Sequence, residues 1–127
     1  MLLVKKLSKV LVVSIMAISL FSCQKKGENL VGKVTYKVEA HGNIFFEKNY
    51  DINDNTCYEI LKQTGLKIED KKNAYGVYIV AIEDYREFAE GPSSGWIYYI
   101  NGEYAPCESD QYYLQDGDEI LWKYISE

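Results

Sequence analysis

Histidine is nearly absent from this chain, which has 127 residues and a single histidine, His41. The motifs of P-loop proteins, G-x-G-x-x-G dinucleotide-binding proteins and H-E-x-x-H metalloproteases are absent as well. A catalytic His41 would need a nucleophile or metal ligands nearby, and the segment His41-Gly42-Asn43 is typical of an exposed turn instead. We therefore expect no enzyme activity, no catalytic residue and no metal site.

Basic residues are also few, since 14 Lys and Arg stand against 19 Asp and Glu, for a net charge of -5. Lys5, Lys6 and Lys9 lie in a segment that we expect to be removed, and the remaining eleven basic residues against nineteen acidic ones give -8. Binding to a phosphate backbone requires a basic surface, so the composition excludes nucleic acid as an expected partner.

The chain lacks a hydrophobic run long enough for a permanent membrane helix. The uncharged run Val10–Phe21 has twelve residues, about 18 Å of helix against a hydrocarbon core of about 30 Å. Lysines precede this short run, as in a cleaved signal peptide. We predict a signal peptide over residues 1–22.

The segment Leu20-Phe21-Ser22-Cys23 resembles the lipobox of bacterial lipoproteins. The resemblance implies that Cys23 is the first mature residue and that it carries a diacylglycerol group and acyl chains such as palmitate. It also implies an extracytoplasmic protein that is lipid-anchored to the bacterial cell membrane. The alternative is an ordinary secretory signal followed by a chance cysteine. We expect residues 23–32 to be the lipidated cysteine and a polar tether, and residues 33–127 to be one domain.

Hydrophobic periodicity predicts the first elements of that domain. Lys33–Ala40 alternates apolar and polar residues, and Ile44–Ile52 predicts the returning strand of a hairpin. Thr56-Cys57-Tyr58-Glu59 fits a capping box before a helix of about nine residues. Cys57, Ile60 and Leu61 form its apolar stripe, and Leu66–Asn73 predicts a charged connector with a short edge strand at Leu66–Ile68.

Short strands make up the second half of the domain. Ala74–Ile82 is apolar at both its odd-numbered and its even-numbered positions, which favours a central strand covered on both sides. Trp96–Ile100 and Glu119–Ile125 alternate, and Pro106 limits the strand at Glu103–Ala105. The order predicts an α+β fold with a mixed sheet of about four to six short strands packed on one helix. The pattern favours a β-grasp, a ubiquitin-like roll, over other α+β rolls.

Aromatic residues concentrate in Gly91–Tyr124, which contains both tryptophans and six of the twelve tyrosines. Asn101-Gly102 and Asp116-Gly117 predict hairpin turns. Trp122 is predicted to lie in the core, whereas for Tyr99 and Tyr104 binding and structural roles are equally open. The candidate ligand-binding residues are Trp96, Tyr98, Tyr99, Asn101, Gly102 and Tyr104.

Two cysteines remain after lipidation of Cys23. In an oxidising compartment this pair favours a disulfide between Cys57 and Cys107. The alternative is a buried free Cys57 on the helix face and an exposed Cys107.

The segments Ser94–Gly102 (SGWIYYING) and Asp116–Tyr124 (DGDEILWKY) together resemble the signature of a family of bacterial surface domains. That family is similar to the C-terminal β-grasp domain of transcobalamin and intrinsic factor, and the resemblance covers roughly Lys33 to Tyr124. It implies a β-grasp fold of the ligand-binding kind, which in the animal carriers covers one face of cobalamin. The large helical domain of those carriers has no room in this sequence.

Two functions follow as hypotheses. The first is a membrane-anchored extracytoplasmic binding lipoprotein for a corrinoid (cobalamin-like) or other small ligand, with no resident cofactor. The alternative is a cell-surface module that binds protein or a polymer, or an accessory lipoprotein of a transporter.

Overall fold

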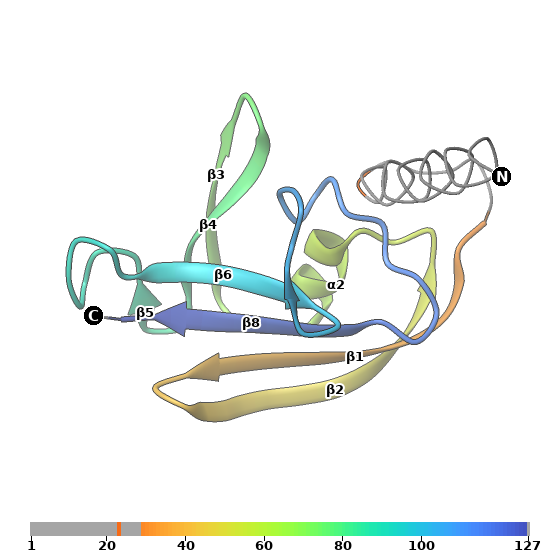
Figure 1. The fold of residues 1–127 in the computed structure, drawn as a ribbon, viewed down its shortest axis with the longest axis horizontal. Helices are drawn as coiled ribbons and strands as arrows, with labels where there is room; N and C mark the ends of the chain where they lie inside the picture. Colours follow the sequence, from red (N-terminus) through yellow and green to blue (C-terminus); the bar gives the residue numbers. More distant parts are fainter. Residues whose placement is uncertain (1–22, 24–28, 127) are drawn as a thin grey trace, which may run out of the picture.

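The computed structural model describes Cys23 and residues 29–126, which form two β-sheets and one short helix (Figure 1). The predicted signal peptide and most of the predicted tether lie outside the described residues. No helix in the described part of the chain is both long and apolar enough to span a bilayer.

The larger sheet has five strands and is mixed. Only β1 and β8 pair in parallel, while the other neighbours are antiparallel. Its order is β2 (Asn43–Asn53), β1 (Val31–Ala40), β8 (Glu119–Ile125), β6 (Gly95–Ile100) and β7 (Glu103–Tyr104). These strands confirm the predicted hairpin and the predicted strands at Trp96–Ile100, Glu103–Ala105 and Glu119–Ile125.

The single described helix, α2 (Cys57–Gln63), begins at the predicted capping box. The Glu59 amide donates to the Thr56 hydroxyl at 3.2 Å, and the Thr56 amide donates to the Glu59 carboxylate at 2.8 Å. Both bonds satisfy amides that the first helical turn leaves without partners. Cys57, Ile60 and Leu61 are fully buried, as the apolar stripe predicted.

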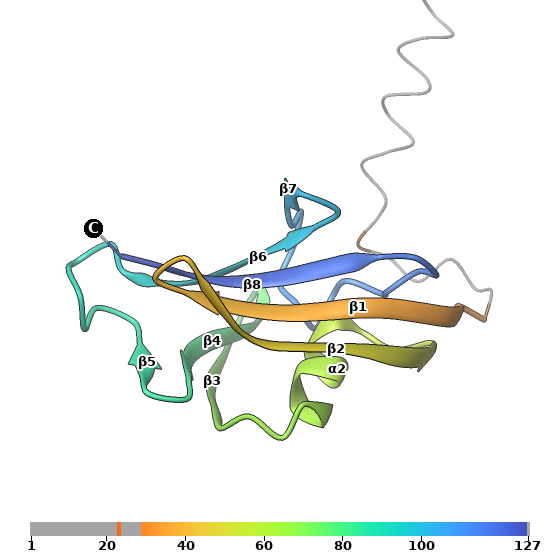
Figure 2. The ribbon, with the colours of Figure 1, turned by 90° about the horizontal axis from the view of Figure 1, so that it is seen from below.

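A second sheet has the order β3 (Ile68–Asn73), β4 (Gly76–Ile82), β5 (Tyr85–Arg86). The predicted charged connector is therefore wrong over most of its length, because β3 continues to Asn73. Its charged side chains are tolerated since β3 is an edge strand with exposed Lys71 and Lys72. Figure 2 shows α2 and this sheet on one side of the larger sheet, with β7 rising on the other.

Side chains from both sheets and from α2 meet in one core around Tyr36. The Tyr36 hydroxyl donates to the Cys57 carbonyl at 2.7 Å and accepts from the Trp122 indole at 2.7 Å. Burial, followed by the neighbouring Cys57, raises the pKa of Tyr36 well above its ordinary value, so the hydroxyl keeps its proton. The chain is thus mostly β, with a mixed sheet and one short helix. The predicted core position of Trp122 is confirmed, since it is 3% exposed.

Candidate functional site

Strand β6 is only partly covered at the edge of its sheet. Strand β7 pairs with Tyr99 and Ile100, and one further bond follows from the Ala105 amide to the Tyr98 carbonyl at 3.1 Å. Pro106 comes next and has no amide hydrogen with which to extend the ladder. The remaining edge of β6, around Trp96, has no hydrogen-bonded strand beside it within the described residues.

Two adjoining hollows of about 410 and 480 Å³ lie along this uncovered edge. Both are lined by Tyr78, Trp96, Ile97 and Tyr104, and we call them together the β6-edge groove. One end is bounded by Ala105, Pro106, Cys107 and Glu108, and the other by Phe88, Pro92, Ser93 and Ser94. Tyr104 is 73% exposed, so much of its ring is free for contact.

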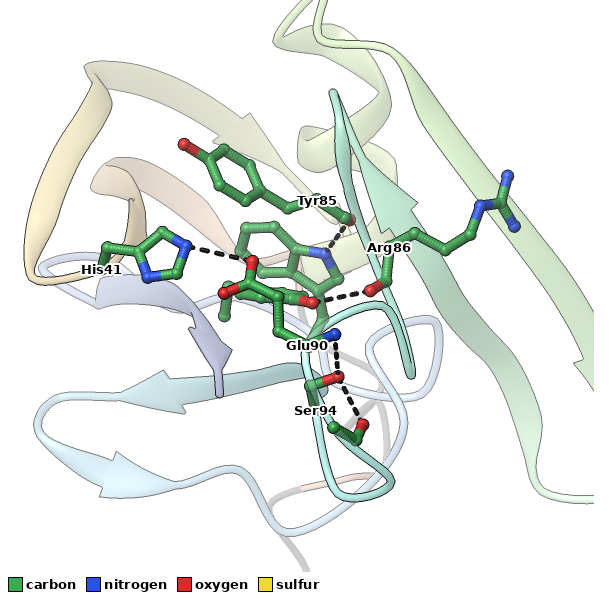
Figure 3. A network of polar contacts seen from close by, with 8 residues as sticks. His41, Tyr85, Arg86, Glu90 and Ser94 are labelled. Atoms are coloured by element: carbon green, nitrogen blue, oxygen red, sulfur yellow. Dashed lines mark hydrogen bonds and ion pairs between the residues drawn. The ribbon is translucent and has the colours of Figure 1, made fainter. Parts of the chain in front are cut away.

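The loop at the Ser94 end is held in place by a polar network (Figure 3). The His41 imidazole lies 3.1 Å from the Glu90 carboxylate, which ties this loop to the β1–β2 turn. The Glu90 amide donates to the Ser94 hydroxyl at 3.1 Å, and the Trp96 indole donates to the Tyr85 carbonyl at 2.8 Å. The loop is therefore part of the packed structure, and the groove has a defined end.

The side chains of Trp96 and Tyr98, which we predicted to contact ligand, lie in the core. Each residue is 7% exposed, because the even positions of β6 face α2 and the second sheet. The Tyr98 ring stacks on Trp122 at 4.8 Å, and burial raises the pKa of Tyr98. Both residues still line the groove, since they form part of its edge.

Tyr99 and Gly102 lie on the opposite face of the sheet from the core. They line a separate hollow of about 380 Å³ with Lys37, Leu121 and Lys123. The Tyr99 ring lies 5.0 Å from that of Tyr104, so this tyrosine pair separates the hollow from the β6-edge groove. Burial and the nearby Tyr104 raise the pKa of Tyr99. The structure thus divides the predicted aromatic site between two surfaces.

Asn101 uses its side chain within the fold. Its amide nitrogen donates to the Asp118 carboxylate at 3.0 Å, and its oxygen accepts from the Glu119 amide at 2.8 Å. The positive φ of 53° at Asn101 and 85° at Gly102 fits the predicted hairpin turn. The Asn101 side chain therefore locks the β6–β7 turn to the start of β8.

The predicted Cys57–Cys107 disulfide is not formed. Cys107 is bonded to Cys23, while Cys57 is free and buried. The reason is local, because Cys57 lies on the inward face of α2 with its sulfur 3.4 Å from the Tyr36 hydroxyl. Burial raises the pKa of Cys57 to about 12, so it is a structural thiol.

Two features of the groove were missed from the sequence. Tyr78 belongs to the strand predicted at Ala74–Ile82, and its apolar pattern gave no sign that this tyrosine would face a groove on another sheet. The segment Gly91–Gly95 also has the spacing G-x-S-x-G. Here it precedes strand β6 rather than a helix, and the nucleophile elbow of hydrolases requires a strand-to-helix turn.

Among Cys23 and residues 29–126, no group of three or more His, Cys, Asp and Glu side chains is arranged to hold a metal ion.

The fold and the groove define a small, mostly β domain with an aromatic groove at a strand edge. The chain belongs to the family described as "Domain of unknown function (DUF4430)", whose model matches residues 54–126. No curated protein gives a significant match.

Two solved structures show the same fold. A Ruminococcus gnavus crystal structure, described as "a putative metal binding protein", has a TM-score of 0.59 and 17% sequence identity, covering 76% of this chain and 98% of that one. Haptocorrin in complex with Cbi has a TM-score of 0.62 and 13% identity, covering 80% of this chain. The chain matches 27% of the length of haptocorrin, so it corresponds to one part of that protein.

Proposed function

We propose that this protein is a membrane-anchored, extracytoplasmic binding lipoprotein whose β-grasp domain binds a corrinoid or a related small ligand. The observation that carries this proposal is the β6-edge groove, where aromatic side chains line an uncovered strand edge. Small-molecule sites are typically concave and largely apolar, with a few polar groups that set orientation. The similarity to haptocorrin in complex with Cbi supports the choice of ligand class and of the β-grasp fold.

The groove contacts only part of such a ligand. Its two hollows of about 410 and 480 Å³ are open to solvent along the strand edge, and this chain corresponds to about a quarter of haptocorrin. A corrinoid bound here keeps much of its surface exposed. We therefore propose modest affinity for the isolated chain, and a tighter complex where a second protein covers the other face.

The proposed anchor is an acylated Cys23. Its sulfur forms either the thioether to diacylglycerol or the disulfide to Cys107, because a single thiol has one bond to give. In the anchored protein Cys107 is thus a free thiol at the end of the groove. Incorporation of an alkynyl palmitate analogue tests this, with Cys23→Ser expected to abolish labelling and Cys57→Ser expected to retain it.

A second candidate function is a surface module that binds protein or a polymer, or an accessory lipoprotein of a transporter. Exposed large apolar side chains favour it, since Phe88 is 65% exposed, Tyr75 81% and Ile44 48%. Retention of a single protein partner in pull-downs, together with no corrinoid binding, would support this alternative.

Calorimetric titration of the full chain in detergent micelles with cyanocobalamin and dicyanocobinamide tests the first function. Tyr104→Ala removes an exposed groove ring and is expected to weaken binding about tenfold. Tyr75→Ala is the matched control, because it removes a similarly exposed tyrosine, 81% against 73%, that lines neither hollow of the groove. No binding of either corrinoid at 100 µM would refute the corrinoid assignment.

A further inference from the structure

The uncovered edge of β6 presents a pair of backbone groups to the groove. In an antiparallel ladder, residues alternate between those that bond to one neighbour and those that bond to the other. The Asn101 amide donates to the Glu119 carbonyl at 2.8 Å. By alternation, the backbone N–H and C=O groups of the odd-numbered residues of β6 point toward β8. The backbone groups of the even-numbered residues point away from β8, as the bond from the Ala105 amide to the Tyr98 carbonyl confirms. The amide and carbonyl of Trp96 therefore point toward the groove.

Neither of these Trp96 backbone groups has a partner among residues 29–126. The backbone carbonyls at both ends of this uncovered stretch already accept hydrogen bonds. The Ser94 carbonyl accepts from the Phe88 amide at 2.9 Å, and the Tyr98 carbonyl accepts from the Ala105 amide. What remains is one donor and one acceptor from Trp96, with the Tyr98 amide beside them.

One donor beside one acceptor matches a single carboxamide. A primary amide offers a carbonyl oxygen to the Trp96 amide and an N–H to the Trp96 carbonyl, so both groups are satisfied at once. An ester of the same shape offers only acceptors and leaves the Trp96 carbonyl without a donor. A ligand that covers the Trp96 carbonyl without offering a donor takes away its contact with water and leaves it unpaired, which is costly and makes such a pair selective.

The length of the edge argues against an added peptide strand. Binding by strand addition uses a row of backbone bonds along an exposed edge. Here the carbonyls of Ser94 and Tyr98, four positions apart, already accept hydrogen bonds, so the row is interrupted at both. The Tyr104 ring and the side chain of Ile97 then provide apolar contact for whatever carries the amide.

We infer that the β6-edge groove contains a carboxamide-binding subsite, in which the backbone amide and carbonyl of Trp96 hold a primary amide of a small ligand. This inference rests on the proposed function, because a corrinoid carries several peripheral primary amides on an apolar macrocycle. The subsite selects for the amide and is indifferent to the metal of the macrocycle.

Backbone NMR of the full chain in detergent micelles tests the subsite directly. Labelling with ¹⁵N-tryptophan gives two backbone amide signals, since Trp96 and Trp122 are the only tryptophans. Trp122→Phe assigns them. Trp122 lies inside the ladder between β1 and β6 and serves as the internal control. Dicyanocobinamide is expected to shift the Trp96 amide proton downfield while leaving that of Trp122 in place.

Two ligand pairs separate the amide from the macrocycle. The heptamethyl ester of dicyanocobyrinic acid, in which methyl esters replace the amides, is expected to bind about tenfold more weakly than cobinamide. Propionamide at high concentration is expected to shift the Trp96 signal, and methyl propionate is not.

The outcomes distinguish the subsite from the proposed function. Equal binding of ester and amide corrinoids, or binding without a Trp96 shift, would overturn the subsite and leave the corrinoid function intact. A propionamide shift without corrinoid binding would support the subsite and remove the corrinoid. A larger shift of the Trp96 amide signal with an acetylated alanine tripeptide amide than with dicyanocobinamide would make a peptide the occupant and overturn the inference.

Discussion

The Tyr36 hydroxyl joins three parts of the core, and its removal should be measurable. Tyr36 lies on β1, accepts from the Trp122 indole of β8 at 2.7 Å and donates to the Cys57 carbonyl of α2 at 2.7 Å. Tyr36→Phe keeps the ring and leaves the buried Trp122 N–H without an acceptor. An unsatisfied buried group costs about 1–3 kcal/mol, and the lost bond to Cys57 adds about 1 kcal/mol. We expect a loss of about 2–4 kcal/mol.

Tyr50 provides a matched control on the neighbouring strand. Its ring meets that of Tyr36 edge-on at 6.1 Å, and its hydroxyl is buried with no partner among the described residues. Tyr50→Phe therefore removes a polar group that makes no bond, and the free energy of unfolding is expected to change by less than about 0.5 kcal/mol or to rise.

Urea unfolding at pH 7, followed by far-ultraviolet circular dichroism, compares the two variants. At about 4–8 °C per kcal/mol for a domain of this size, Tyr36→Phe should also lower the melting temperature by about 8–32 °C. Equal stability of Tyr36→Phe and Tyr50→Phe would refute this prediction, because the Tyr36 hydroxyl would then make no net contribution.

Three further predictions concern single residues. Burial raises the pKa of Cys57 to about 12, so iodoacetamide at pH 8 should leave Cys57 unmodified in the native protein and label it in urea, as read by mass spectrometry. Gly76 has a φ of 131° and its added methyl would meet the Asp110 carboxylate, so Gly76→Ala should cost about 3 kcal/mol in urea unfolding. Gly42→Ala, at a φ of 76° in open space, should cost about 1 kcal/mol. Burial and then Asp110 raise the pKa of Glu108, so Glu108→Gln should melt at a higher temperature than the parent at pH 7.

Proton linkage determines whether Glu108 stabilises or destabilises the fold at a given pH. A carboxyl whose folded pKa exceeds its unfolded value contributes most stability when protonated, below the unfolded pKa of about 4.3. That contribution is lost as the pH rises through the folded pKa. The advantage of Glu108→Gln should therefore vanish near pH 3, and an advantage that persists there would contradict the electrostatic explanation. For Gly76→Ala, a cost equal to that of Gly42→Ala would contradict the predicted clash.

Local patterns in the sequence predicted most elements because their causes are local. Alternation over Lys33–Ala40 specifies a strand with one buried face, and Thr56 and Glu59 satisfy helix amides within four residues of chain. Asn101-Gly102 supplies the positive φ that its hairpin requires. The alternation of Glu119–Ile125 likewise fits the predicted core position of Trp122.

Only the tertiary structure decided which strands are neighbours, and with that the site. Periodicity says which face of β6 is buried, but the groove arises at its edge, where β7 stops after Tyr104 and the second sheet brings Tyr78 alongside. The partner of Cys107 is decided in the same way, since α2 turns Cys57 inward and leaves Cys23 within reach. Edges and long-range pairs depend on strand order, and a local pattern carries no information about which strand comes next in the sheet.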